Sequence, residues 1–180
     1  FMKKEGLTDI KTFDYNSHKA IYNECQEEFC PNKEIEFLSE FLKRGYELIF
    51  ITFNQPYYKF TKVFDKKLLN KVKFIDCTPH AIKNNSEDNV LFLDYEVSLF
   101  SLSGEISKQW NKLGKKRLLF LDCAEFLFMK YETKDLFKFI HRIVQKYQQD
   151  GVVIFCFLNG AMDKTVQTQL KHLFSEVTYL

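Results

Sequence analysis

The chain has 180 residues, of which 46% are hydrophobic and only 6 are glycine and 3 proline. This length and apolar content fit one folded domain and exclude a disordered chain. The 26 lysine and arginine residues nearly balance the 24 acidic residues, and no basic run extends beyond Lys115–Arg117. Because this balance leaves no electrostatic footprint for nucleic acid, we expect no nucleic-acid partner.

No stretch of the sequence reaches the ~18 apolar residues of a membrane span, and no signal peptide is recognisable. The cysteines are odd in number (5), and two of them lie inside apolar runs. Such usage is typical of a reducing compartment and not of a disulfide framework. We therefore predict a cytoplasmic protein with no membrane partner and no disulfide.

Short apolar runs alternate with longer helical patterns along the chain. Several runs are apolar on both faces, as are strands of a parallel sheet that helices cover on both sides. The alternation predicts an α/β fold with a doubly wound, mostly parallel sheet and helices on both faces, in a single domain over residues 1–180. The predicted strands are Lys11–Tyr15, Leu48–Phe53, Val72–Asp76, Val90–Leu93, Leu118–Asp122, Val152–Leu158 and Val177–Leu180.

Helical spacing of apolar residues marks the segments between these strands. The clearest begins at Thr133, where we expect Leu136, Ile140, Ile143 and Tyr147 to face the sheet, with Lys134, Lys138, Gln145 and Gln148 in water. A helical pattern is also read at Ile21, Tyr22, Cys25 and Phe29. The predicted helices are Pro31–Arg44, Tyr57–Leu69, Leu99–Leu113, Thr133–Gln149 and Asp163–Phe174.

Ligands of doubly wound sheets bind beyond the carboxyl ends of the strands. Polar residues stand at or just after the predicted strand ends, and we take them as candidates for a ligand crevice: Asn16, Ser17, Lys19, Asn54, Gln55, Asp122, Glu125 and Asn159. Asp122 with Glu125 is a weak candidate for a divalent metal site, since one or two carboxylates without a phosphate partner hold Mg²⁺ poorly. We expect capping or pairing at the strand end, and no metal.

The apolar run Arg117–Leu121 ends in Asp122, which is a Walker-B-like pattern. From here to Leu180 the order of elements resembles the C-terminal half of archaeal RecA-superfamily proteins related to the clock protein KaiC. The matching segments are Glu125–Met129, the helix around Leu136–Arg142, Gly151 with a buried strand, and Met162-Asp163 leading to the last strand. Upstream, Gly45–Phe53 looks like the second core strand, so the resemblance covers Gly45 to Leu180 and leaves 2–44 as its least defined part.

Two features of that family are missing. A phosphate loop needs G-x-x-x-x-G-K-S/T, because glycines let backbone amides close around phosphates. Here Asn16–Lys19 follows the first predicted strand without a glycine, and the one Gly-Lys pair, Gly114-Lys115, precedes a strand. In KaiC-like ATPases the second core strand ends in two glutamates, one of which activates water; here Asn54-Gln55 stands in their place, and amides cannot act as a general base.

The resemblance therefore implies a degenerate ATPase domain that does not hydrolyse ATP. It is similar to uncharacterised archaeal KaiC-like domains, and to a domain of some sensory regulators, that share the core without a phosphate loop. We expect a non-hydrolysing regulatory or protein-interaction module that has no cofactor and acts with a protein partner or as a homo-oligomer. The alternative is a nucleotide-binding switch or ATPase that binds ATP/Mg²⁺ through an unusual contact such as Lys19, or through a site that a partner subunit completes.

Other groupings favour structural roles. Cys25 and Cys30 with Cys77 and His80 supply four possible zinc ligands, but the spacing is not that of a known finger, so we predict no zinc site. Asp122 next to Cys123 opposes use of that thiol as a nucleophile. The residues Tyr57, Phe60 and Phe64 have the spacing of one buried helix face and are predicted to belong to the core.

Overall fold

The computed structural model describes residues 8–25, 31–79 and 88–180. In these residues seven strands form one sheet in the order β4-β3-β2-β5-β6-β1-β7, and every neighbouring pair is parallel. This confirms the predicted parallel α/β sheet, in which β3, β2, β5 and β6 are contiguous. The strands are β1 (Lys19–Cys25), β2 (Glu47–Thr52), β3 (Val72–Asp76), β4 (Val90–Phe92), β5 (Arg117–Leu121), β6 (Val152–Leu158) and β7 (Glu176–Tyr179).

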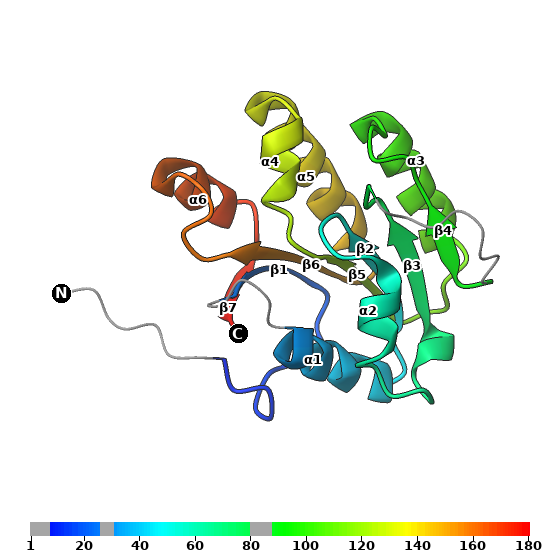
Figure 1. Ribbon diagram of the computed structural model, residues 1–180. Coiled ribbons are helices and arrows are strands. Elements are labelled where there is room, and N and C mark those ends of the chain that lie inside the picture. Colours follow the sequence, from blue (N-terminus) through cyan, green and yellow to red (C-terminus); the bar gives the residue numbers. More distant parts are fainter. Residues whose placement is uncertain (1–7, 26–30, 80–87) are drawn as a thin grey trace.

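Helices cover both faces of the sheet (Figure 1). The helices are α1 (Pro31–Lys43), α2 (Tyr57–Thr61), α3 (Leu99–Trp110), α4 (Phe126–Lys130), α5 (Thr133–Tyr147) and α6 (Lys164–Lys171), with a 3₁₀ turn at Leu69–Lys71. One core packs α1 and α2 against the sheet. A second core, on the opposite face, packs α3, α4, α5 and α6 against it. The doubly wound arrangement is therefore confirmed. No helix in the described ranges is both long and apolar enough to span a bilayer.

Helix α5 shows why the periodicity of this segment is a strong signal. Leu136, Ile140, Ile143 and Tyr147 are all buried against the sheet, as predicted, and Phe139 and Val144 widen the same face. The predicted water-facing residues Lys134, Lys138 and Gln145 are exposed, and Gln148 is half-buried. One apolar stripe on a polar helix thus fixes which side meets the sheet.

The predicted strand Lys11–Tyr15 is wrong. These residues form a turn, in which the Lys11 amide donates to Asp9 Oδ1 at 2.9 Å, followed by an extended segment outside the sheet. The alternating apolar residues are Phe13 and Tyr15. The ring of Phe13 packs edge-on against Phe37 of α1, and the ring of Tyr15 packs edge-on against Phe41 of the same helix. Two aromatic residues that pack on α1 thus alternate with polar residues in the same way as the residues of a strand.

The first strand is instead β1, in a segment that the sequence pattern presented as helical. Its seven residues are all buried, including the polar Asn23 and Glu24. Thr178 Oγ1 on β7 donates to Asn23 Oδ1 at 2.8 Å, and Lys171 Nζ on α6 lies 2.9 Å from Glu24 Oε2. Because these partners satisfy the two polar side chains, β1 can lie inside the sheet although its sequence does not look like that of a buried strand.

The helical segments also differ from prediction in part. The helix predicted over Tyr57–Leu69 ends at Thr61, yet Tyr57, Phe60 and Phe64 are buried as expected. A short unpredicted helix, α4, follows β5 and buries Leu127. At the end of α1, Gly45 adopts a φ of 88°, a left-handed conformation that glycine accepts without strain.

Candidate functional site

The carboxyl ends of β2, β5, β6 and β1 lie side by side, because these strands are consecutive in the sheet and parallel. Asn54 and Gln55 follow β2, Asp122 follows β5, and Asn159 follows β6. Glu125 stands just before α4 at the same edge, and its Oε2 accepts a hydrogen bond from the Leu158 amide at 3.2 Å. The structure therefore brings five of the eight sequence-predicted residues to one edge, where ligands of such sheets bind.

The other three predicted residues lie at the opposite edge of the sheet. Asn16 and Ser17 precede β1, and Lys19 is its first residue, so they stand at its amino end. The Asn16 amide and the Ser17 hydroxyl both donate to Asp14, at 3.0 and 2.8 Å. The grouping of these residues with Asp122 is therefore wrong, and the reason is the misplaced first strand.

Lys19 is held in place by its own neighbours at this far edge. Its Nζ donates to the Asp14 carbonyl oxygen at 2.7 Å and lies 3.1 Å from Glu176 Oε2. Lys19 is the first of the seven residues of β1, and the distance to the carboxyl end of this strand is about 20 Å at the usual rise of a strand. Lys19 is therefore not available to a ligand beside Asp122.

Asp122 is buried at the end of β5. Thr52 Oγ1 lies 3.5 Å from Asp122 Oδ2, and the Cys123 thiol donates to Oδ1 at 3.4 Å. Cys123 has a φ of 49°, a left-handed conformation that is uncommon for a residue with a side chain. Burial, followed by the charge of Asp122, raises the pKa of Cys123, which opposes its use as a nucleophile.

The two amides that follow β2 contact other side chains of the chain. Asn54 Nδ2 lies 4.0 Å from Cys123 Sγ, and Lys59 Nζ donates to Gln55 Oε1 at 2.5 Å. Asn159 is exposed, and its backbone amide donates to the Cys25 carbonyl oxygen at 2.8 Å. Their side chains supply neither a base nor a carboxylate to this edge.

The most concentrated chemistry at this edge was not predicted from the sequence. Glu34, in the first turn of α1, is buried beside Cys25 of β1 and Cys156 of β6. Burial raises the pKa of Glu34, and burial with the nearby Glu34 raises the pKa of Cys156. The hydrogen bond with Cys156 lowers the pKa of Cys25, but burial and the nearby Glu34 outweigh it and raise that pKa to about 11. Burial, then Glu34 and Glu125, raise the pKa of Asp122.

The edge is thus acidic in character. Three carboxyl groups, on Glu34, Asp122 and Glu125, are buried there, and among the described residues none of the three forms an ion pair with a lysine, arginine or histidine. The segment that connects β1 to α1 reads Gln26-Glu27-Glu28-Phe29-Cys30 and lies outside the described residues. It occupies the chain position of a phosphate loop after the first strand, and its sequence contains two glutamates and no glycine.

The four possible zinc ligands singled out in the sequence do not form one group. Cys25 ends β1 and Cys77 follows β3, with β2, β5 and β6 between these strands. Four strand spacings amount to about 19 Å, so Cys25 and Cys77 cannot share an ion. Cys30 and His80 lie outside the described residues.

Comparison with known proteins shows the fold. No protein-family model matches the chain, and no curated protein matches its sequence. Solved structures do match: flagellar accessory protein FlaH from Methanocaldococcus jannaschii (TM-score 0.57, 14% identity), protein PH0250 from Pyrococcus horikoshii OT3 (0.60, 12%) and an ATPase from the type III secretion system of pathogenic bacteria (0.59, 9%). Each match covers 91% of this chain, and the shares of the other chains are 71%, 82% and 51%.

These neighbours give the chain a RecA-like α/β fold, as the resemblance in the sequence implied. At such low identities they do not transfer an activity. Asp122 and Glu34 lie at the carboxyl edge of the sheet, which is the edge at which ligands of doubly wound sheets bind.

Replacing Asp122 with asparagine is expected to stabilise the protein at neutral pH. Burial, then Glu34 and Glu125, raise the pKa of Asp122, so folding favours its protonated form, and the group destabilises the fold increasingly as the pH rises above the unfolded-state value of about 3.9. Asparagine cannot ionise, and its one carbonyl oxygen can still accept a hydrogen bond from either Thr52 or Cys123. We expect Asp122→Asn to raise the melting temperature at pH 7.5 by at least about 2 °C, or about 1 kcal/mol for a chain of this size.

The sign of the effect is checked by repeating the melting experiment at lower pH. The gain should be much smaller near pH 4, because the wild-type carboxyl is then protonated in the folded state and about half protonated in the unfolded state. A gain that is the same at pH 4 and pH 7.5, or a loss at pH 7.5, would contradict the reading.

Proposed function

We propose that the chain is a non-hydrolysing regulatory or protein-interaction module on a RecA-like fold. The observation that carries this proposal is the acidic carboxyl edge of the sheet. Glu34, Asp122 and Glu125 are buried there, at the edge where a nucleotide would place its phosphates. Phosphate groups are stabilised by backbone amides and cations, and the three buried carboxyl groups supply neither.

The chemistry for hydrolysis is also lacking. Asn54 and Gln55 stand where the resemblance places catalytic glutamates, and an amide does not take up a proton from water. Gln55 Oε1 already accepts a hydrogen bond from Lys59. The binding and the catalytic requirements therefore fail independently, and both support a role without turnover.

A RecA-like fold serves more than one kind of role. Among the structural neighbours one is named an accessory protein of the flagellum and another an ATPase. Since the fold is compatible with both, the residues at the site have to decide. For this chain they favour the accessory kind of role, in which the domain acts through its contacts with other proteins.

A surface suited to such contacts lies between α3 and α5. Phe100 is 85% exposed at a groove of about 520 Å³, which Lys138 and Arg142 line together with Glu132 and Asp135. A large apolar side chain in water at a groove that carries both charges suits a protein partner with apolar and polar contact residues. We therefore propose this groove as the contact surface for the protein partner.

The second candidate function is a nucleotide-binding switch. Asp122 favours it, because it ends β5 at the position of a Walker-B carboxylate and could attract Mg²⁺. The form of this hypothesis that uses Lys19 as the phosphate contact loses support, since Lys19 lies at the opposite edge. The remaining form of the switch hypothesis is a nucleotide site that a partner subunit completes.

A thermal-shift experiment with nucleotides separates the two functions. We expect millimolar ATP or ADP with Mg²⁺ to leave the melting temperature within about 1 °C of that with Mg²⁺ alone. A true ligand at a hundred times its dissociation constant adds about 2.7 kcal/mol, or roughly 5–10 °C for a chain of this size. A rise of that order, seen with ATP but not with inorganic phosphate, would favour the switch.

A further inference from the structure

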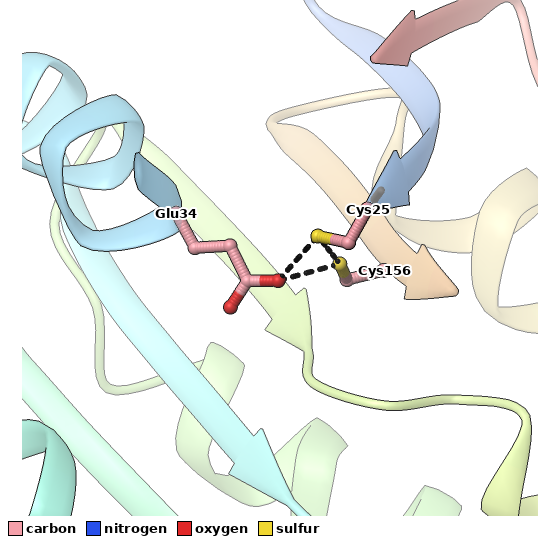
Figure 2. A group of neighbouring side chains, drawn as sticks. All are labelled: Cys25, Glu34 and Cys156. Atoms are coloured by element: carbon pink, nitrogen blue, oxygen red, sulfur yellow. Dashed lines mark hydrogen bonds between the residues drawn. The ribbon is translucent and has the colours of Figure 1, made fainter. Parts of the chain in front are cut away.

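Two thiols and one carboxylate from three different elements meet in the core between α1 and the sheet (Figure 2). Cys25 Sγ lies 2.7 Å and Cys156 Sγ 2.8 Å from the same oxygen, Glu34 Oε1, and the two sulfurs are 3.1 Å apart. All three residues are buried. The sulfurs are not bonded to each other, because a disulfide bond is only about 2.05 Å long.

Such a cluster is not explained by packing alone. A buried carboxyl is ordinarily paired with a cation or ligates a metal, since burial of an unpaired charge is strongly unfavourable. Within the described ranges no lysine, arginine or histidine lies within ion-pair distance of Glu34. Its neighbours are two groups that can themselves become anions, so the cluster as a whole would be stabilised by a cation.

The three atoms are arranged as the ligands of a small tetrahedral ion would be. Zinc binds thiolate sulfur at about 2.3 Å and carboxylate oxygen at about 2.1 Å, which places neighbouring ligand atoms roughly 3.6 Å apart. The observed separations of 2.7, 2.8 and 3.1 Å would each widen by less than 1 Å to admit the ion. One tetrahedral position would remain for a water molecule or a further ligand.

A second layer of contacts supports thiolate ligands. Asn23 Nδ2 lies 3.2 Å from Cys156 Sγ and 3.7 Å from Cys25 Sγ, so the amide N–H groups point toward both sulfurs. Its carbonyl end is fixed by Thr178 Oγ1, which donates at 2.8 Å. Donors that contact ligating atoms orient them and stabilise their anionic form.

We propose that Cys25, Cys156 and Glu34 bind one Zn²⁺ ion, which joins β1, β6 and α1 at the edge of the sheet. Thiolate and carboxylate ligands together suit zinc among the common divalent ions, whereas Mg²⁺ and Ca²⁺ take oxygen ligands. This inference replaces the sequence-based prediction of no zinc site. It does not depend on whether the chain binds nucleotides.

The test is zinc binding by the full chain, kept reduced with a phosphine and freed of metal with a chelator. Zn²⁺ is titrated in competition with a chromophoric chelator, and Co²⁺ serves as a probe whose thiolate charge-transfer band reports sulfur ligands. We expect the wild type to bind one equivalent. We expect Cys156→Ser and Glu34→Gln each to weaken binding by at least tenfold, and Cys156→Ser to reduce the Co²⁺ charge-transfer band.

Cys77→Ser is the matched control, because Cys77 is also a buried cysteine near a strand end but is remote from the cluster. It should keep the zinc affinity of the wild type. Glu34→Gln guards against a variant that merely fails to fold, since glutamine resembles the protonated carboxyl in shape and charge. Its metal-free melting temperature should be no lower than that of the wild type, while the rise that zinc produces in the wild type is lost.

Three results would overturn the proposal. The first is no zinc uptake by the reduced wild type. The second is an equal loss of binding in Cys77→Ser. The third is retention of wild-type affinity by both Cys156→Ser and Glu34→Gln. A Cys25–Cys156 disulfide in protein purified without reductant, with no zinc uptake after reduction, would assign the thiol pair to redox chemistry instead.

Discussion

Replacing Ile140 with alanine should lower the free energy of unfolding by about 2–5 kcal/mol, the range measured for buried aliphatic truncations. Ile140 is completely buried in the middle of α5, in the core that joins this helix to the sheet. The truncation removes three methyl or methylene groups and leaves a cavity that the strands beneath cannot fill, because a regular sheet relaxes little.

Urea denaturation measures this change directly. The matched control is His141→Ala, since His141 is the next residue of the same helix and is exposed; its effect should stay within about 0.5 kcal/mol. A change near zero for Ile140→Ala, or equal changes for both variants, would mean that the buried face of α5 is wrongly assigned.

Replacing Gly151 with alanine should destabilise the protein by about 1–3 kcal/mol or more, as overpacking of a tight core does. A Cβ atom at this position would lie 2.6 Å from Trp110 Cη2 and 2.7 Å from the Arg117 carbonyl oxygen. Neither neighbour can yield easily: the Trp110 ring packs on Tyr147, with ring centroids 4.7 Å apart, and the Arg117 carbonyl belongs to β5.

Gly104→Ala is the control, because it is expected to stabilise the protein whereas Gly151→Ala destabilises it. Gly104 lies in α3, where a Cβ would meet nothing within 4 Å. Alanine there should stabilise the protein by about 0.4–1 kcal/mol, because it restricts the unfolded chain and favours helix. Urea denaturation of both variants is decisive: if Gly151→Ala stabilises the protein as Gly104→Ala is expected to do, the close approach of Trp110 to Gly151 is not real.

The elements that could be predicted are those whose buried residues form a recognisable pattern over a few neighbouring positions of the sequence. Strands β2, β3, β5 and β6 carry apolar side chains toward both faces, and α5 carries one stripe, so their types and positions follow from neighbouring residues alone. Asp122 follows from the same reasoning, because it directly ends such a strand.

Strand β1 could not be read in this way. Asn23 and Glu24 interrupt its apolar pattern, and their partners Thr178 and Lys171 are about 150 residues away in the sequence. Phe13 and Tyr15 meanwhile alternate like a strand while they cover α1. One misplaced strand then assigned Asn16, Ser17 and Lys19 to the wrong edge of the sheet.

The thiol–carboxylate cluster is invisible to local spacing for a related reason. Glu34 is close to Cys25 in the chain, but Cys156 is brought to them only by the parallel pairing of β1 with β6. A usable signal existed in principle, namely that both cysteines lie near the carboxyl ends of their strands. It required the correct position of β1.

The central claim, a RecA-like domain without ATP turnover, is tested most directly by phosphate release from ATP and Mg²⁺ at high protein concentration. We predict no release above the buffer rate. We also predict none from the double variant Asn54→Glu/Gln55→Glu, since a general base contributes only about 10²–10⁴-fold and the phosphate site would still be lacking. Release that scales with wild-type protein and disappears in Asp122→Ala would contradict the claim, whereas release that persists in Asp122→Ala would come from a contaminant.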